Sequence, residues 1–158
     1  MHVLERQTIG PVRPRAENAE ERKSGWAWSA IRALGALALL AVGAVHLQQY
    51  FDLYSAIPTI GTLFVLNFAG ATAIGLGLLA PVERLLGRWG RPVVALLALG
   101  GAGLAATAFV FLLVSEHTPL FGFMEPGYDP TAILASRVAE AVTFLSLGSF
   151  LVSRIARG

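Results

Sequence analysis

The sequence predicts an all-α membrane protein, an antiparallel bundle of four transmembrane helices with a disordered N-terminal tail. Three observations support this fold class. Of 158 residues, 55% are hydrophobic and only 14% are charged, whereas soluble domains average about 25% charged residues. Four apolar stretches are long enough to cross a hydrocarbon core of about 30 Å. The basic residues outside these stretches all fall on one side of a single four-span topology.

The elements follow in order along the chain. Residues 1–25 are polar, mixed in charge and contain two prolines, and such a composition favours a disordered cytoplasmic tail. A transmembrane domain follows over residues 26–158, with spans expected near 30–50, 59–81, 93–114 and 131–152. We expect the first span to be a retained signal anchor. The short basic segment between the second and third spans makes these two antiparallel neighbours in an up-down bundle.

Small residues recur at four-residue spacing in the predicted spans. The second span carries Ala69, Ala73 and Gly77, and the third carries Ala98, Ala102 and Ala106. Small side chains at this spacing let helix backbones approach closely, which drives helix association inside lipid. The sequence therefore predicts that these two rows are packing ridges.

The distribution of charge predicts the orientation. Eleven of the 12 Lys and Arg residues lie in the tail, at the start of the first span, between the second and third spans, or after the fourth. With five acidic residues on that side, its net charge is +6. The opposite side holds only the acids Asp52, Glu116, Glu125 and Asp129. Because Lys and Arg in short loops favour the cytoplasm, both termini are expected to be cytoplasmic.

A few polar residues lie within the spans at similar depth, toward the predicted outer side. They are His46, Asn67, Arg137 and Glu140, with Thr107 nearby. A charged residue near mid-helix costs about 2.5–3.5 kcal/mol on insertion scales, so Arg137 and Glu140 need partners. Their i,i+3 spacing predicts that they pair with one another.

Two interpretations of this polar cluster remain open at this stage. In the first, the cluster lines an outward-facing ligand pocket, in which Arg137 would contact an anion or a carbonyl group because its donors are fixed in a fork. In the second, Arg137 and Glu140 form an internal salt bridge, and Asn67 and His46 hydrogen-bond between helices. The long segment 115–130 would cover the bundle mouth through Leu120, Phe121, Phe123 and Met124, or lie on the membrane interface.

Two histidines also suggest cofactor chemistry. His46 and His117 both lie near the predicted outer face, on separate helices, so they could ligate a haem or a metal ion. A hydrogen-bonded interfacial role is the simpler alternative for each. The chain has no cysteine, which excludes disulfides and thiolate metal ligands. We identify no catalytic pattern and no metal-ligand spacing.

Three segments resemble known proteins. The segments HLQQY at 46–50, IPTIGTLFVLNFAGA at 57–71 and LFGFMEPGYD at 120–129 resemble uncharacterised four-helix integral membrane proteins of high-GC bacteria. The resemblance covers most of residues 30–152 and implies a fold and a plasma-membrane location. The chain is more loosely similar to DoxX-like membrane proteins, which are associated with respiratory redox complexes. Neither resemblance implies a role for any individual residue.

Three functions are consistent with the sequence. The first is a non-enzymatic accessory protein or subunit that has the outward-facing pocket and binds a larger membrane complex or another copy of itself. The second is a redox-associated protein that binds quinone or haem. The third is a small transporter. The pI near 9.5 does not indicate a nucleic-acid partner, because the basic residues follow the spans rather than forming a patch.

Overall fold

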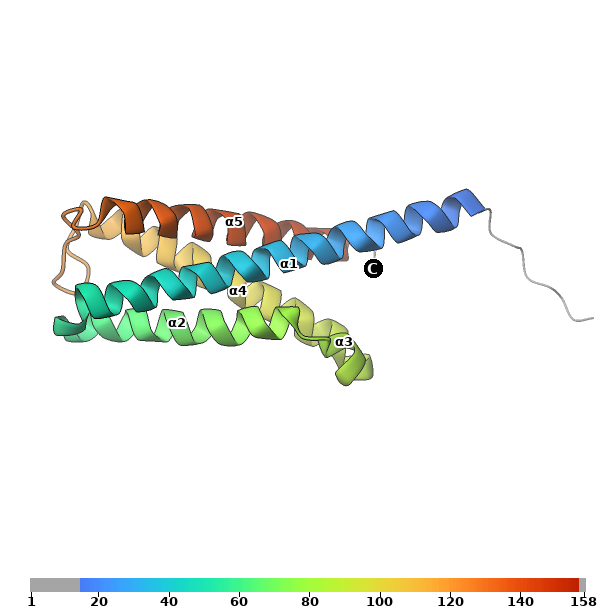
Figure 1. Ribbon diagram of the computed structural model, residues 1–158, viewed down its shortest axis with the longest axis horizontal. Helices are drawn as coiled ribbons and strands as arrows, with labels where there is room; N and C mark the ends of the chain where they lie inside the picture. The colour runs from blue at the N-terminus through green and yellow to red at the C-terminus, as the bar shows by residue number, and fades with distance from the viewer. Residues whose placement is uncertain (1–14, 157–158) are drawn as a thin grey trace, which may run out of the picture.

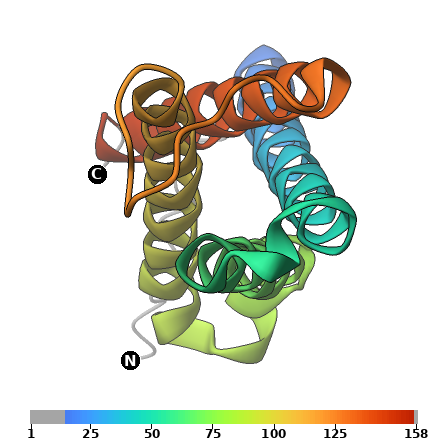
Figure 2. The ribbon, with the colours of Figure 1, turned by 90° about the vertical axis from the view of Figure 1, so that its left-hand side faces the viewer.

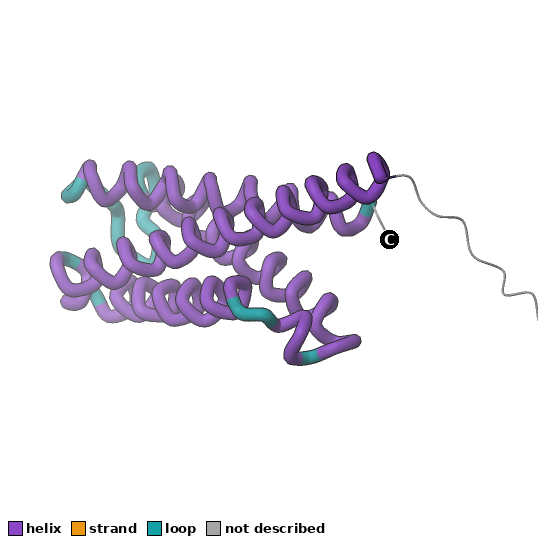
Figure 3. Tube along the Cα trace, turned by 45° about the vertical axis from the view of Figure 1, so that its right-hand side comes forward, coloured by secondary structure: helices purple, strands orange, loops and turns teal. Residues whose placement is uncertain are grey.

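The computed structural model describes residues 15–156 and confirms an all-α fold. Four long helices dominate it: α1 (Arg15–Asp52), α2 (Pro58–Leu79), α4 (Gly90–Ser115) and α5 (Pro130–Ile155). Three short elements, η1 (Tyr54–Ala56), α3 (Val82–Leu85) and η2 (Gly87–Trp89), lie in the connections. Figure 1 shows the long helices side by side, and Figure 3 shows how little of the described chain is loop.

Four helical segments are apolar and long enough to span a membrane, and each covers most or all of one long helix. These segments are Gly25–Asp52, Pro58–Leu79, Gly87–Ser115 and Pro130–Ile155. They contain or closely match the four expected spans. The first 14 residues of the predicted tail (1–25) lie outside the described residues. From Arg15 onward the backbone is helical, in a stretch rich in Ala, Glu and Arg, which are strong helix formers.

The helices form a ring in the order α1, α2, α4, α5 (Figure 2). One end of the bundle holds residues 52–57 and 116–129 and is called the loop end. The other end holds α3, η2 and the end of α5 and is called the basic end. Helix α4 crosses the bundle obliquely: it lies beside α2 at the basic end and beside α5 at the loop end (Figures 1 and 2). As a result, α2 and α4 diverge toward the loop end, and theirs is the least extensive of the four interfaces between ring neighbours.

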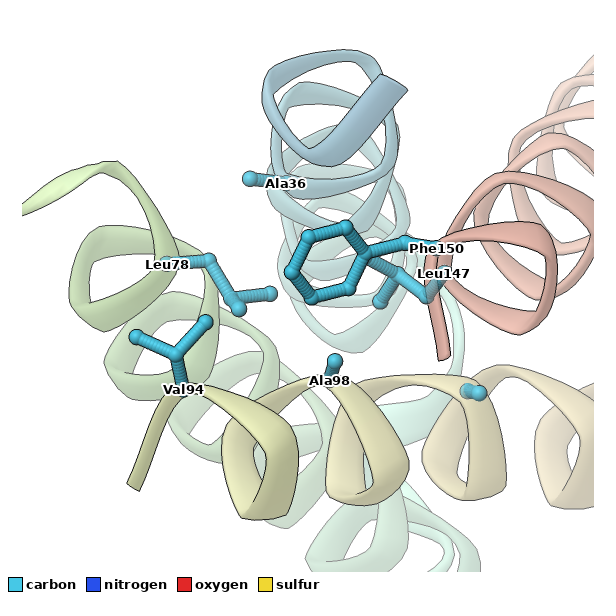
Figure 4. Close-up of a cluster of buried hydrophobic side chains, with 7 residues drawn as sticks. Ala36, Leu78, Val94, Ala98, Leu147 and Phe150 are labelled. Carbon is cyan, nitrogen blue, oxygen red and sulfur yellow. The ribbon is translucent and has the colours of Figure 1, made fainter. Parts of the chain in front are cut away.

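The tightest hydrophobic packing lies in the half of the bundle nearer the basic end. All four long helices contribute to this core (Figure 4). Its buried members are Ala36, Leu78, Val94, Ala98, Ala102, Leu147 and Phe150. Burying a side chain the size of Leu or Phe within protein brings many dispersion contacts, which drive helix association where lipid is already apolar.

The two predicted small-residue ridges differ in the structure. On α4, Ala98 and Ala102 are buried, as expected. On α2, however, Ala69 and Ala73 are exposed, so the prediction for this helix was wrong. The buried row of α2 includes Ala71 and Gly75 instead. The reason is that α2 packs most extensively against α1, which turns the 69–73 row outward.

Close helix contacts explain why two glycines lie in this interface. A Cβ added at Gly75 would lie 2.8 Å from the Leu40 side chain and 3.2 Å from the Ala36 carbonyl oxygen on α1. A Cβ at Gly43 of α1 would lie 3.1 Å from the Cβ of Ala71 on α2. Glycine therefore permits a close backbone approach, and a larger residue at either position would force its neighbours on the facing helix to shift.

Charged groups tie three elements together at the basic end. Glu83 of α3 lies 3.6 Å from Arg32 of α1 and 3.6 Å from Arg154 of α5. These three residues come from sequence segments that the charge distribution had assigned to one side. Their meeting at one end agrees with the predicted up-down arrangement of the spans.

Candidate functional site

A cavity of about 240 Å³ lies in the half of the bundle nearer the loop end. All four long helices and the segment between α4 and α5 contribute to its walls. The lining comprises Val45, His46, Gln49, Tyr54, Ile60, Leu63, Phe64, Leu66, Asn67, Leu104, Thr107, Ala108, Phe111, Leu112, Ser115, Leu120, Phe123, Glu125, Ala132, Ile133, Ser136 and Glu140. Most of these side chains are apolar, and a few polar groups converge among them, which is the usual composition of a small-molecule site.

Three of the five predicted site residues line this cavity. They are His46 of α1, Asn67 of α2 and Glu140 of α5, and the predicted neighbour Thr107 of α4 joins them. The similar depths inferred from the sequence therefore correspond to one space shared by four helices. The structure supports the pocket interpretation of these residues to this extent.

His46 has one ring nitrogen engaged. Its Nδ1 lies 2.9 Å from the Val42 carbonyl oxygen one turn earlier in α1. A carbonyl can only accept, so Nδ1 carries the proton, and in the neutral ring Nε2 is then a hydrogen-bond acceptor. The ring also contacts Phe64 of α2, with the ring centroids 4.9 Å apart.

Glu140 and Asn67 each keep an oxygen without a hydrogen-bond partner. The Ser136 hydroxyl donates to Glu140 Oε1 at 2.8 Å, but Glu140 Oε2 and Asn67 Oδ1 are buried and unpaired in the structure. Glu140 is 1% exposed and Asn67 is 8% exposed. Buried polar atoms without partners are uncommon in folded proteins and require an explanation.

Arg137 is not where the sequence placed it. Its guanidinium pairs with Glu116 at the start of the segment between α4 and α5, and it does not line the cavity. The predicted Arg137–Glu140 ion pair was therefore wrong. Positions 137 and 140 are neighbours on the surface of α5, but Glu140 is buried in the bundle, whereas Arg137 is partly exposed and its guanidinium reaches Glu116 at the end of α4.

His117 also lies outside the cavity lining. It is exposed, and its Nδ1 lies 3.0 Å from the Leu113 carbonyl oxygen. This hydrogen bond agrees with the simpler alternative for His117, whose position at a membrane interface stays a prediction. His46 and His117 do not face one another across the cavity.

The segment 116–129 forms part of the cavity wall at the loop end through Leu120, Phe123 and Glu125. Glu125 is 6% exposed and is held by several donors. Its Oε2 accepts a hydrogen bond from the Tyr54 hydroxyl, and its Oε1 accepts from the backbone of Gly127 at 2.8 Å and of Tyr128 at 3.1 Å. Its own backbone N–H donates to the Ser115 carbonyl at 2.8 Å. Glu125 therefore fastens the segment to η1 and to the end of α4.

Tyr54 is the counterpart of Glu125 in this contact. It is 5% exposed, and its ring packs against Phe64 and Phe123 with centroids 4.5 and 5.6 Å away. Burial raises the pKa of Tyr54 well above its usual range, and the neighbouring Glu125 carboxyl raises it further. The phenol therefore stays protonated and remains a donor to Glu125.

A tight turn points two side chains of this segment into the cavity. Leu120 and Phe123 pair through backbone hydrogen bonds of 2.7 and 3.0 Å, and both line the cavity. Between them, Phe121 and Gly122 have φ values of 52° and 80°, as a type I′ turn requires. Phe121 and Met124 are exposed. Of the four apolar residues expected to cover the bundle mouth, two do so.

Asp129 makes the second connection between this segment and the helices. Its Oδ2 accepts a hydrogen bond of 2.9 Å from the Gln49 side chain of α1. Its Oδ1 accepts from the backbone of Thr131 and Ala132 at 3.1 and 3.0 Å, so Asp129 is the N-cap of α5. The backbone hydrogen bond from Ala132 holds the pKa of Asp129 below its usual range.

Comparisons with family models, with curated proteins and with solved structures give no match. The resemblances stated from the sequence remain expectations. The chemistry of the cavity itself is therefore the basis for assigning a function.

Gln49, Tyr54, Ser136 and Glu125 belong to the site and were not predicted as site residues. Ser136 lies one helical turn before the predicted residue Glu140 on α5. Glu125 was counted only among the acids opposite the basic side, and Gln49 and Tyr54 lie at or just beyond the end of the first span. Among residues 25–156, whose side chains the structure describes, no cluster of three or more His, Asp or Glu could hold a metal ion. The arrangement is suited to binding a small molecule.

Proposed function

We propose that this protein is a multi-pass membrane protein that holds a small amphiphilic molecule in its loop-end cavity, and that it serves as an accessory protein or subunit of a larger membrane assembly. The four apolar helices, each long enough to cross a membrane, support a location in lipid. The observation that carries the proposal is the cavity itself, which has apolar walls, converging polar groups and a cover fastened by Glu125 and Asp129.

The ring of helices explains how such a cavity persists. Because α4 leans from α2 toward α5, the α2–α4 interface is packed near the basic end and separates near the loop end (Figure 2). Both helices contribute several lining residues there, and Leu66 and Phe111 among them are also exposed on the outer surface of the bundle. A molecule in the cavity therefore lies next to the surrounding lipid.

Co-purification tests the proposal while the ligand is still unidentified. The protein is purified from native membranes in a mild detergent, and the small molecules it retains are identified by mass spectrometry. The cavity is filled in the variant Ala132→Trp, because Ala132 lines it. The matched control is Ala135→Trp, on an exposed face of the same helix.

We expect a retained molecule in the wild type and in Ala135→Trp, and its loss from Ala132→Trp. Equal retention by all three proteins, or no retained molecule in any, would count against a ligand-binding role. Proteins that co-purify with the wild type would identify the proposed larger assembly.

The charge distribution supports an orientation with the loop end outside the cytoplasm and both termini inside, in the plasma membrane. The chain has no cysteine, so single cysteines can be placed at exposed positions Thr118 and Ala156. An impermeant thiol reagent applied to intact cells should label position 118 and leave position 156 unlabelled. The reverse pattern would invert the proposed topology.

A quinone- or haem-binding role is the second candidate. Its support is His46, whose Nε2 is available within a cavity lined by several aromatic rings. A haem would give the purified protein a Soret absorption band, and a bound quinone would be found in the organic extract. His117 lies outside the cavity lining, so a haem held between these two histidines has no structural support.

A further inference from the structure

The charge of the cavity differs from the sequence-based expectation. Arg137 had been expected to contact an anion or carbonyl group, but its guanidinium is paired with Glu116 outside the cavity. None of the described residues that line the cavity is Lys or Arg, whereas two of them, Glu125 and Glu140, are acidic. An anionic ligand would find no counter-charge there.

The two carboxyl groups are in different situations. Glu125 has three hydrogen-bond donors, the Tyr54 hydroxyl and two backbone N–H groups. Glu140 has one donor, Ser136, and its Oε2 has none. A buried carboxylate is stable only when it is paired and hydrogen-bonded. Glu140 therefore lacks a hydrogen-bond donor at Oε2, whereas both carboxyl oxygens of Glu125 have donors.

Three lining residues from three helices each keep an acceptor atom without a hydrogen-bond partner. The atoms are Glu140 Oε2 on α5, Asn67 Oδ1 on α2 and, in the neutral ring, His46 Nε2 on α1. A ligand that satisfies them must donate hydrogen bonds, and a primary ammonium group carries three donors and a positive charge. A hydroxyl group, by contrast, offers a single donor and no charge.

The walls of the cavity suit the same kind of ligand. Phe64, Phe111 and Phe123 line it together with Tyr54. Aromatic faces attract cations through the ring quadrupole, most strongly when water is excluded. The apolar remainder of the lining accommodates a hydrocarbon or aromatic body.

We propose that the cavity binds a lipophilic primary amine in its ammonium form, with the nitrogen at Glu140, Asn67 and His46 and the apolar part against the aromatic walls. This inference rests on the proposed ligand-binding function and specifies its ligand class. A phosphatidylethanolamine headgroup carries the same ammonium, but it would bring a phosphate into a cavity without a cation. The structure therefore favours a free amine over a lipid headgroup.

Three probes of similar size and shape but different charge test this. Phenylbutylamine is a cation, phenylbutanol is neutral and phenylbutanoate is an anion. Binding of each to the full chain in phosphatidylcholine nanodiscs is measured by titration calorimetry, with empty nanodiscs correcting for partition into lipid. We expect the amine to bind about tenfold or more tightly than the alcohol, as charge-assisted hydrogen bonds imply, and the anion to show no binding.

The variant Glu140→Gln removes the charge with little change in shape. We expect it to weaken binding of the amine by about tenfold or more and to leave binding of the alcohol nearly unchanged. The matched control is Asp52→Asn, which removes the same charge from an exposed position outside the cavity. It should leave the amine's affinity unchanged.

Several results would overturn the inference. One is equal affinity of the wild type for phenylbutanol and phenylbutylamine, and this comparison needs no variant. Another is Glu140→Gln binding the amine with wild-type affinity. If phosphatidylethanolamine added to the nanodiscs competes with phenylbutylamine, the ligand is a lipid headgroup and not a free amine. A neutral molecule that co-purifies with the wild type and is lost from Ala132→Trp would uphold the proposed ligand-binding function and refute the amine as its ligand. Failure of the inference can therefore be distinguished from failure of the proposed function.

Discussion

Removing the Tyr54 hydroxyl tests the contact that fastens the cover over the cavity. In Tyr54→Phe, the Glu125 carboxyl loses its donor on Oε2 while it stays buried, since Glu125 is 6% exposed and Tyr54 is 5% exposed. Leaving a buried acceptor without its partner costs about 1–3 kcal/mol. For a chain of this size, each kcal/mol corresponds to a change in Tm of about 2–4 °C.

Thermal unfolding in detergent at neutral pH measures this cost. We expect Tyr54→Phe to lower Tm by about 4–8 °C, corresponding to about 2 kcal/mol. The control is Tyr128→Phe, because Tyr128 is 64% exposed. We expect its Tm to stay within about 1–2 °C of the wild type, as is usual for surface substitutions. Equal Tm values for Tyr54→Phe and the wild type would show that the hydroxyl does not hold the cover.

The pH dependence gives an independent check on the same residue. The pKa of Tyr54 is raised in the folded protein above the usual tyrosine value of 10.0. Above pH 10 the unfolded chain therefore loses this proton while the folded protein retains it, so stability falls as pH rises. We expect this alkaline loss to be smaller in Tyr54→Phe. The same alkaline slope in both proteins would contradict the assigned environment of Tyr54.

Further predictions concern the other contacts at the loop end and the helix packing. Arg137→Leu and Glu116→Gln should each lower Tm. The double variant should lose less stability than the two single variants together, with a coupling free energy of about 0.5–3 kcal/mol. Strictly additive losses would show that the two residues are not partners. Gly75→Val should destabilise the protein by about 1–3 kcal/mol, because its side chain would overlap Leu40, as overpacking generally does; an unchanged unfolding curve would argue against close contact of α1 and α2. The pKa of Asp129 is lowered in the folded state, so the Asp129 carboxylate stabilises the fold above the usual aspartate pKa of 3.8. This stabilisation should disappear as pH falls below that value, and Asp129→Asn should not show this loss of stability in acid.

The sequence was a good guide to the elements and to the level of the polar residues along each helix. Apolar length and the distribution of charge predict the four spans, and the helices of the structure agree with them within several residues. The depth of His46, Asn67 and Glu140 follows from counting along each helix. Their presence in one cavity was therefore a reasonable expectation.

Helix rotation and long-range pairing were harder to predict. Arg137 was paired with Glu140 because the two are neighbours in sequence, but its partner is Glu116, 21 residues away across a turn. The Tyr54–Glu125 contact joins residues 71 apart. Such pairs depend on how the helices lean and on how a loop folds back over them, and local spacing contains little information on either.

The buried face of α2 shows the same limit. Its small residues occur on more than one side, so spacing alone does not reveal which row faces α1. Packing selected Ala71 and Gly75 over Ala69 and Ala73 because α1 is the main neighbour of α2. Where small residues are abundant, the choice of ridge is a tertiary property.

Accessibility of the cavity wall is the most direct test of the central claim, that the loop-end half of the bundle encloses a ligand-sized space. Single cysteines at Ser136 and Thr143 lie on the same buried face of α5, but only Ser136 lines the cavity, whereas Thr143 is 0% exposed and packed. The rate of modification by a small apolar thiol reagent, measured by mass spectrometry, distinguishes the two positions. We predict rapid modification at position 136, slowed by bound phenylbutylamine, and little modification at position 143. Equally slow modification at both positions would contradict the enclosed space.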